Sequence, residues 1–128
     1  MFEGIIAMAK ENLKNGILVG LGTDTACPYV TQYDMWRELC YYAKFCGVSN
    51  AFALYSATLL NAELAGIGGE TGSIERGKRA EMIVVRKNPL EDLRALRTPE
   101  MFIMGERLIR APRVKKIPEV EAELDKWL

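Results

Sequence analysis

The chain has 128 residues, enough for one domain, and its 49% hydrophobic content argues against a disordered protein. Its 17 basic and 17 acidic residues give a formal net charge of zero, which removes the electrostatic argument for nucleic acid or an anionic membrane as a partner. It contains no histidine, which excludes a Ser-His-Asp triad, a Cys-His pair and every histidine-containing zinc site within this chain.

The first predicted element is a helix over residues 2–15. Apolar residues spaced four apart share one face of it, and Gly16 follows as a C-terminal stop. The next five residues, ILVGL (17–21), are apolar and too few for a helix, which is typical of a strand covered on both faces. A helix, a tight turn and a buried strand together predict an αβ unit of a parallel sheet.

The predicted strand runs into the tripeptide GTD (22–24). A carboxylate at the end of an apolar strand has to be paired, hydrated or used, because burying it bare is costly. Asp24 is therefore a candidate site residue, and the alternative is a strand-end residue that caps nearby backbone amides. Cys27 is either a thiol ligand or, as we favour, a partly buried inert thiol. Tyr29 and Tyr33 either line a substrate pocket or pack within the loop.

Two more helices are predicted after this loop. Residues 34–46 carry apolar side chains at helical spacing. Ser49 is the expected N-cap of the next helix, which begins the stretch NAFALYSATLLNAELAGI (50–67). The hydroxyl groups of Ser56 and Thr58, in the middle of that helix, are predicted to bond back to the preceding turn.

Short strands are predicted after a change of composition near residue 66. The run Gly66–Gly72 lacks the ending of a phosphate-binding loop and is interpreted as a connector. Beyond it we expect a strand in AEMIVV, a helical turn after NPLED, a hairpin around Gly105-Glu106, a solvated RVKKI run and a helix beginning near Pro118. The strands around Ile83 and Phe102 are predicted to form a small β unit that is separate from ILVGL.

The three cysteines, Cys27, Cys40 and Cys46, are odd in number and contain no CxxC pair, which indicates reduced thiols in a cytoplasmic protein. Cys40 and Cys46 are interpreted as core residues. No apolar stretch approaches the ~20 residues of a membrane span. The N-terminal residues lack the basic start and the cleavage site of a signal peptide. We therefore expect a cytoplasmic protein without a membrane partner.

The order of these signals resembles the C-terminal portion of the metal-dependent amidohydrolase superfamily, in the branch of imidazolonepropionase-like and Xaa-Pro-dipeptidase-like enzymes. The likeness spans residues 10–110 and depends on several short motifs that occur in the family's order. These motifs are Gly22-Thr23-Asp24, Ala57-Thr58, Asn61-Ala62, Gly72-Ser73-Ile74-Glu75, Gly77-Lys78, Ala80-Glu81 and Asn88-Pro89-Leu90-Glu91-Asp92.

The resemblance implies a (β/α)8 barrel that carries divalent metals at the carboxyl ends of its strands, beside a small β-sandwich built from both chain termini. Closing such a barrel takes ~250 residues, more than this chain has. The predicted fold class is therefore α/β, a partial barrel consisting of its last αβα segment, together with part of the sandwich. The expected boundaries are 1–66 for the barrel segment, 67–110 for the sandwich segment and 111–128 for a C-terminal helix.

The resemblance also implies that Asp24 is the terminal aspartate of the last barrel strand, a metal ligand that takes the proton from metal-bound water. The implied cofactor is a divalent metal, zinc, and the implied reaction is hydrolysis of an amide-type C–N bond in a dipeptide or a cyclic amide. The family's other ligands are histidines on earlier strands, and this chain has none. We therefore expect the isolated chain to hold no metal and to be inactive.

Two functional hypotheses remain open. In the first, the chain is the C-terminal part of an amidohydrolase, and its partner is the missing N-terminal barrel portion, which is either on another chain or lost by truncation. In the second, it is a non-catalytic remnant or structural module that persists as a homo-oligomer. Both predict that the chain is not monomeric, because the ILVGL strand presents apolar side chains on two faces and unpaired backbone groups on two edges.

Overall fold

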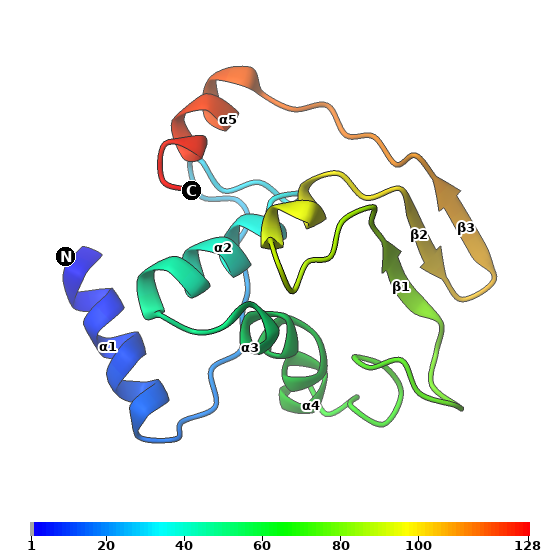
Figure 1. Ribbon diagram of the computed structural model, residues 1–128, viewed down its shortest axis with the longest axis horizontal. Helices are drawn as coiled ribbons and strands as arrows, with labels where there is room; N and C mark the ends of the chain where they lie inside the picture. The colour runs from blue at the N-terminus through cyan, green and yellow to red at the C-terminus, as the bar shows by residue number, and fades with distance from the viewer. Residues whose placement is uncertain (1) are drawn as a thin grey trace.

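The computed structural model describes residues 2–128 and shows a group of helices beside a small antiparallel sheet (Figure 1). The described elements are α1 (Phe2–Lys14), α2 (Met35–Cys46), α3 (Asn50–Tyr55), η1 (Ser56–Leu60), α4 (Asn61–Leu64), β1 (Glu81–Val84), η2 (Leu93–Arg97), β2 (Met101–Met104), β3 (Arg107–Arg110) and α5 (Pro118–Asp125). The predicted α/β fold class is confirmed to the extent that helices and a small antiparallel sheet occur in one chain. None of the described helices has the length and apolar character needed to cross a membrane.

The helices begin and end where the sequence places their caps. Gly47 follows α2 in the left-handed region, with a φ of 76°, and its N–H donates to the Ala43 carbonyl at 3.1 Å. Ser49 Oγ accepts a hydrogen bond from the Phe52 N–H at 3.1 Å, so the predicted N-cap of α3 is confirmed. Pro118 lies in the first turn of α5, as its position in the sequence predicts.

The helix that starts with α3 continues into α4 through η1, a turn of π-helix. Thr58 Oγ1 donates to the Leu54 carbonyl at 2.7 Å, which confirms the back-bonding predicted for this residue. The prediction is wrong for Ser56, whose buried Oγ makes no hydrogen bond to the preceding turn within residues 2–128. A π turn holds more residues than an α turn, so it changes the direction in which the side chains of α4 point.

The hydrophobic core lies in the helical part of the molecule. Leu39 and Tyr42 of α2, Ala53 of α3 and Leu93 of η2 form one cluster, and each of them is at most 6% exposed. Burial of this apolar surface is the main stabilising contribution. Because η2 lies in the chain between β1 and β2, Leu93 attaches the sheet region to the helices.

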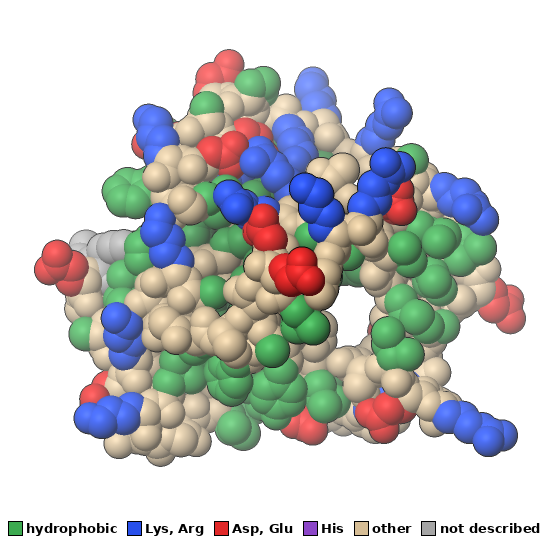
Figure 2. All heavy atoms as spheres, in the orientation of Figure 1, with side chains coloured by type: hydrophobic (Ala, Val, Ile, Leu, Met, Phe, Trp, Pro, Cys, Tyr) green, Lys and Arg blue, Asp and Glu red, His purple; other side chains and the backbone are tan. Residues whose placement is uncertain are grey.

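The sheet has the strand order β1-β2-β3, and both pairings are antiparallel. Two neighbouring cross-strand rows are apolar: Ile83–Phe102–Ile109 and Met82–Ile103–Leu108. Since successive residues of a strand point to opposite faces, each face of the sheet carries one apolar row. Ile83 and Leu108 are each 56% exposed, so the described residues cover neither face completely. Figure 2 shows an opening between the sheet and the helical part.

The pairing of Ile83 with Phe102 confirms the predicted β unit, and residues 17–21 take no part in it. The strand predicted at 17–21 is wrong, however. This segment runs between α1 and α2 without regular secondary structure, and Ile17 and Leu18 are 53% and 63% exposed (Figure 1). A parallel strand exists only when a neighbouring strand takes its backbone groups, and residues 2–128 supply no such neighbour to this segment. The buried αβ unit is therefore absent from the described part of the chain.

Candidate functional site

Asp24 lies in the loop that connects residues 17–23 with α2. It is exposed, and its φ of 50° is in the left-handed region, which Asp adopts more readily than most residues. Thr23 Oγ1 and Thr25 Oγ1 are hydrogen-bonded to each other at 2.7 Å, one on either side of it in the chain. Within residues 2–128 the Asp24 carboxylate makes no hydrogen bond or ion pair, so the alternative role as a cap of nearby amides is not observed.

The backbone that leads to Asp24 is held by Asn61, the first residue of α4. Asn61 Oδ1 accepts a hydrogen bond from the Leu21 N–H at 2.9 Å, and Asn61 Nδ2 donates to the Leu21 carbonyl at 2.8 Å. Gly20 permits this close approach, because a Cβ at that position would lie 2.5 Å from Asn61 Oδ1. The side-chain amide thus satisfies both backbone groups of Leu21, as a neighbouring strand would.

The other residues predicted in this loop lie in different surroundings. Cys27 is exposed, so the favoured interpretation as a partly buried thiol is wrong; none of the described elements covers that turn. Tyr29 is 59% exposed and adopts a φ of 64°. Tyr33 is half-buried, and Lys116 Nζ lies 5.9 Å from its ring centroid, which favours packing over substrate binding for Tyr33.

Cys40 and Cys46 both lie on α2 and pack against the hydrophobic core, as predicted. Burial raises the pKa of the Cys40 thiol to about 11, and Asp92 contributes in the same direction. Burial also raises the pKa of Cys46. Both thiols are therefore kept protonated at neutral pH and are poor metal ligands and poor nucleophiles.

A catalytic metal centre needs about three protein ligands. In the part of the chain that the structure describes, no group of three or more Cys, Asp or Glu side chains is placed to hold a metal ion. The loop before α2 offers Asp24, Cys27 and Asp34, and the Asp34 carboxylate already accepts hydrogen bonds from Thr31 and Trp36. The residues present do not fit the metal that the resemblance implies, because Asp24 alone does not make a metal site.

A group of charged side chains around the buried Arg37, which the sequence pattern did not indicate, lies between α2, η2 and α5. We call it the α5 network, and its members are Asp34, Arg37, Arg97, Glu121 and Asp125. The Arg37 side chain is 2% exposed and donates to Glu121 at 2.9 Å and to Asp125 at 2.5 Å, while its Nε lies 3.4 Å from Asp34. Arg97 donates to the same two α5 carboxylates, at 3.2 and 2.9 Å.

The charges of the α5 network compensate one another. Burial opposes the charge of Arg37, but its hydrogen bond with Asp125 and the nearby carboxylates prevail and raise its pKa. Burial also opposes the charge of Asp125, but hydrogen bonds from Arg37 and Arg97 prevail and lower its pKa. The two guanidinium groups lie 4.5 and 5.1 Å from the ring centroid of Trp36. This arrangement suits a structural attachment of α5 better than a catalytic group.

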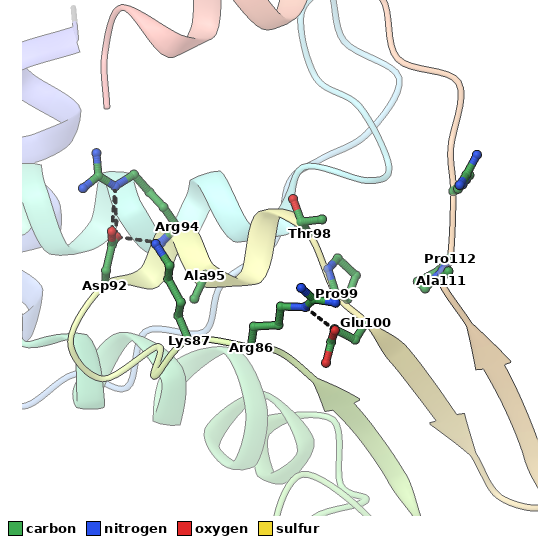
Figure 3. A pocket seen from close by; sticks show the side chains of 11 residues that line it. Arg86, Lys87, Asp92, Arg94, Ala95, Thr98, Pro99, Glu100, Ala111 and Pro112 are labelled. Atoms are coloured by element: carbon green, nitrogen blue, oxygen red, sulfur yellow. Dashed lines mark hydrogen bonds and ion pairs between the residues drawn. The ribbon is translucent and has the colours of Figure 1, made fainter.

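An open groove of about 650 Å³ lies between η2 and the ends of the sheet strands (Figure 3). Its charged lining residues are Arg86, Lys87, Asp92, Arg94, Glu100 and Arg113. Asp92 accepts hydrogen bonds from Arg94, which lower its pKa, and Glu100 is bonded to Arg86. The carboxylates of the groove are therefore engaged by arginine side chains, and its lining includes no residue of the Asp24 loop.

The comparisons with known proteins agree on one family. The model of the amidohydrolase family matches residues 3–108. Among curated proteins, a 5-methylthioadenosine/S-adenosylhomocysteine deaminase of Acetivibrio thermocellus is 34% identical over 88 residues, which cover 62% of this chain and 20% of the deaminase.

Solved structures match over more of the chain. A Bifidobacterium longum protein proposed to be a prolidase has a TM-score of 0.91 and 39% identity over 95% of this chain. A Xaa-Pro dipeptidase with methionine bound in its active site has a TM-score of 0.76 and 30% identity over 83% of this chain. The matched region makes up 30% of the first structure and 25% of the second, so each relative has most of its length outside the match.

Proposed function

Since this chain belongs to the amidohydrolase family, in its prolidase-like branch, we propose that it supplies the Asp24 segment of a hydrolase of amide-type C–N bonds. The hydrolase is completed by an N-terminal barrel portion, which corresponds to the part of the relatives outside the match. Its substrate is a dipeptide or a cyclic amide. By itself, the chain is inactive.

One observation carries this proposal. The fold of the chain matches the Bifidobacterium longum protein with a TM-score of 0.91 over 95% of its own length, yet over only 30% of that protein. A chain that matches about a third of a longer relative this closely is expected to need the rest of that fold in order to catalyse the same type of reaction. The exposed Ile17 and Leu18 side chains, together with the unbonded Asp24 carboxylate, support the same conclusion.

Within the completed hydrolase, Asp24 is the residue of this chain that we assign to the active site, as a ligand of a divalent metal, zinc, and as a proton acceptor. The N-terminal barrel portion supplies the other ligands, because these 128 residues include no histidine. Residues 1–66 belong to the barrel in this assembly, residues 67–110 belong to the β-sandwich, and residues 111–128 add the C-terminal helix.

Coexpression tests the proposal. The chain is produced together with the Bifidobacterium longum relative from which the matched C-terminal portion has been deleted, and hydrolysis of Xaa-Pro dipeptides is measured with added zinc. We expect activity from the pair and none from either polypeptide alone. Asp24→Asn is expected to abolish the activity, whereas Glu106→Gln, a matched change at an exposed turn carboxylate, is expected to preserve it. Activity that survives Asp24→Asn would contradict the assignment.

A non-catalytic homo-oligomer is the second candidate function. The observation that favours it is the exposed apolar surface, including Ile17, Leu18 and Ile83, which copies of the chain could cover on one another. It predicts that copies of the chain associate with each other and that coexpression with the truncated relative gives no hydrolysis. Hydrolysis of Xaa-Pro dipeptides by the coexpressed pair therefore distinguishes the two candidate functions.

A further inference from the structure

We propose that Asn61 is the positioning residue of the Asp24 segment, and that its side-chain amide fixes the backbone from which Asp24 extends. This inference rests on the proposed role of Asp24, which gives the position of that backbone its functional meaning. The contacts that support it are made within this chain.

The two hydrogen bonds between Asn61 and Leu21 define what we call the Asn61 clamp. An asparagine side chain offers one acceptor and one donor group at a fixed spacing, and here both are bonded to the N–H and C=O of the same residue. Asp would keep the acceptor and lose the donor, and Ala would lose both. Leu21 is three residues before Asp24, and the Thr23–Thr25 hydroxyl bond joins the two residues that flank Asp24.

The helix presents Asn61 from a rigid base. Its neighbours Leu60 and Ala62 are 1% and 6% exposed, so they anchor α4 in the protein. The π turn η1 directly precedes Asn61, and one additional residue in a helical turn rotates the following side chains by roughly 100°. The π turn therefore sets the direction in which Asn61 points.

Gly20 provides an independent observation on the other side of the clamp. A Cβ at Gly20 would lie 2.5 Å from Asn61 Oδ1 and 3.0 Å from Leu64 Cδ1. The segment thus approaches α4 as closely as its backbone allows. Gly20→Ala is expected to open the clamp while leaving the helix sequence unchanged.

The first test uses nuclear magnetic resonance on the full chain. Asn61→Ala is expected to speed hydrogen exchange of the Leu21 amide by about tenfold and to reduce the residual dipolar couplings of the Thr23–Thr25 amides. Gly20→Ala should produce the same two changes. Asn50→Ala is the matched control, because it removes a hydrogen bond from an asparagine amide to the Leu90 carbonyl at the start of the same helix. Unchanged exchange and couplings in both Asn61→Ala and Gly20→Ala would overturn the proposal.

The second test uses the coexpressed pair described above. Asn61→Ala is expected to lower kcat by roughly 10- to 100-fold with little change in KM, because a displaced Asp24 affects the reaction more than substrate binding. Asn50→Ala is expected to leave both constants unchanged. A wild-type kcat in Asn61→Ala would overturn the positioning role even if the couplings change. If the wild-type pair is inactive, the proposed function fails, and the exchange and coupling measurements decide whether the clamp orders the Asp24 segment.

Discussion

Arg37 shows how much of this molecule depends on single side chains that the sequence does not distinguish. A charged residue in an amphipathic helix normally lies at the surface, and Arg37 is instead 2% exposed beneath α5. Its position follows from Asp34, Glu121 and Asp125, two of which lie more than 80 residues away in the chain. No local spacing predicts such a contact, whereas Asp24 could be singled out as a candidate because it follows the apolar run 17–21 after only two residues.

Replacing Arg37 tests the energetic weight of the α5 network. Arg37→Ala removes the guanidinium that bonds both α5 carboxylates, while Arg97 and Lys116 remain beside Glu121, so the free energy of unfolding is expected to fall by about 2 to 3 kcal/mol. Urea unfolding at a fixed protein concentration measures the change. The control is Lys14→Ala, which removes an exposed ion pair with Glu11 at 4.0 Å and should change stability by less than about 1 kcal/mol. Equal changes in the free energy of unfolding would show that the α5 network stabilises the protein no more than an exposed ion pair does.

At the scale of elements, the helices and the sheet were predictable because their signals are local. Caps such as Ser49 and Gly47, the hairpin turn at Gly105 and apolar spacing are sufficient to place α1, α2, α3, α5 and the three strands. The strand prediction at residues 17–21 failed because a parallel strand depends on a non-local partner. An apolar run becomes a parallel strand only beside another strand, and that condition depends on chain segments that residues 2–128 do not include. In this segment the Asn61 clamp bonds the backbone N–H and C=O of Leu21.

The attachment of α5 is expected to depend on pH. The pKa of Asp125 is lowered in the folded protein, so its contribution to stability is present above the ordinary Asp pKa of about 3.9 and is lost as the pH falls through the folded value. Urea unfolding of the wild type should therefore show decreasing stability as the pH falls below about 4. Asp125→Asn is expected to be less stable near pH 6 and to lose less stability on acidification. An identical pH dependence in both proteins would rule out this contribution.

At the scale of the whole molecule, apolar surface remains uncovered in several places. Both faces of the sheet carry exposed apolar side chains, Ile17 and Leu18 are exposed, and so are Ile5 and Met8 of α1 at 56% and 60%. Green apolar patches lie on the helical part and on the sheet side in Figure 2, with an opening between the two. Exposed apolar patches of this kind mark interaction sites in soluble proteins, and the longer relatives have most of their length outside the match.

The molar mass of the purified chain in solution, measured by sedimentation at micromolar concentration, tests most directly the claim that these 128 residues are incomplete without the N-terminal barrel portion. We predict a mass above the 14.4 kDa of one chain, because copies associate through the uncovered apolar surfaces when no other partner is present. We also predict that the truncated relative breaks up these assemblies and forms a mixed complex. A single species of 14.4 kDa that unfolds cooperatively and forms no complex with the truncated relative would contradict this claim.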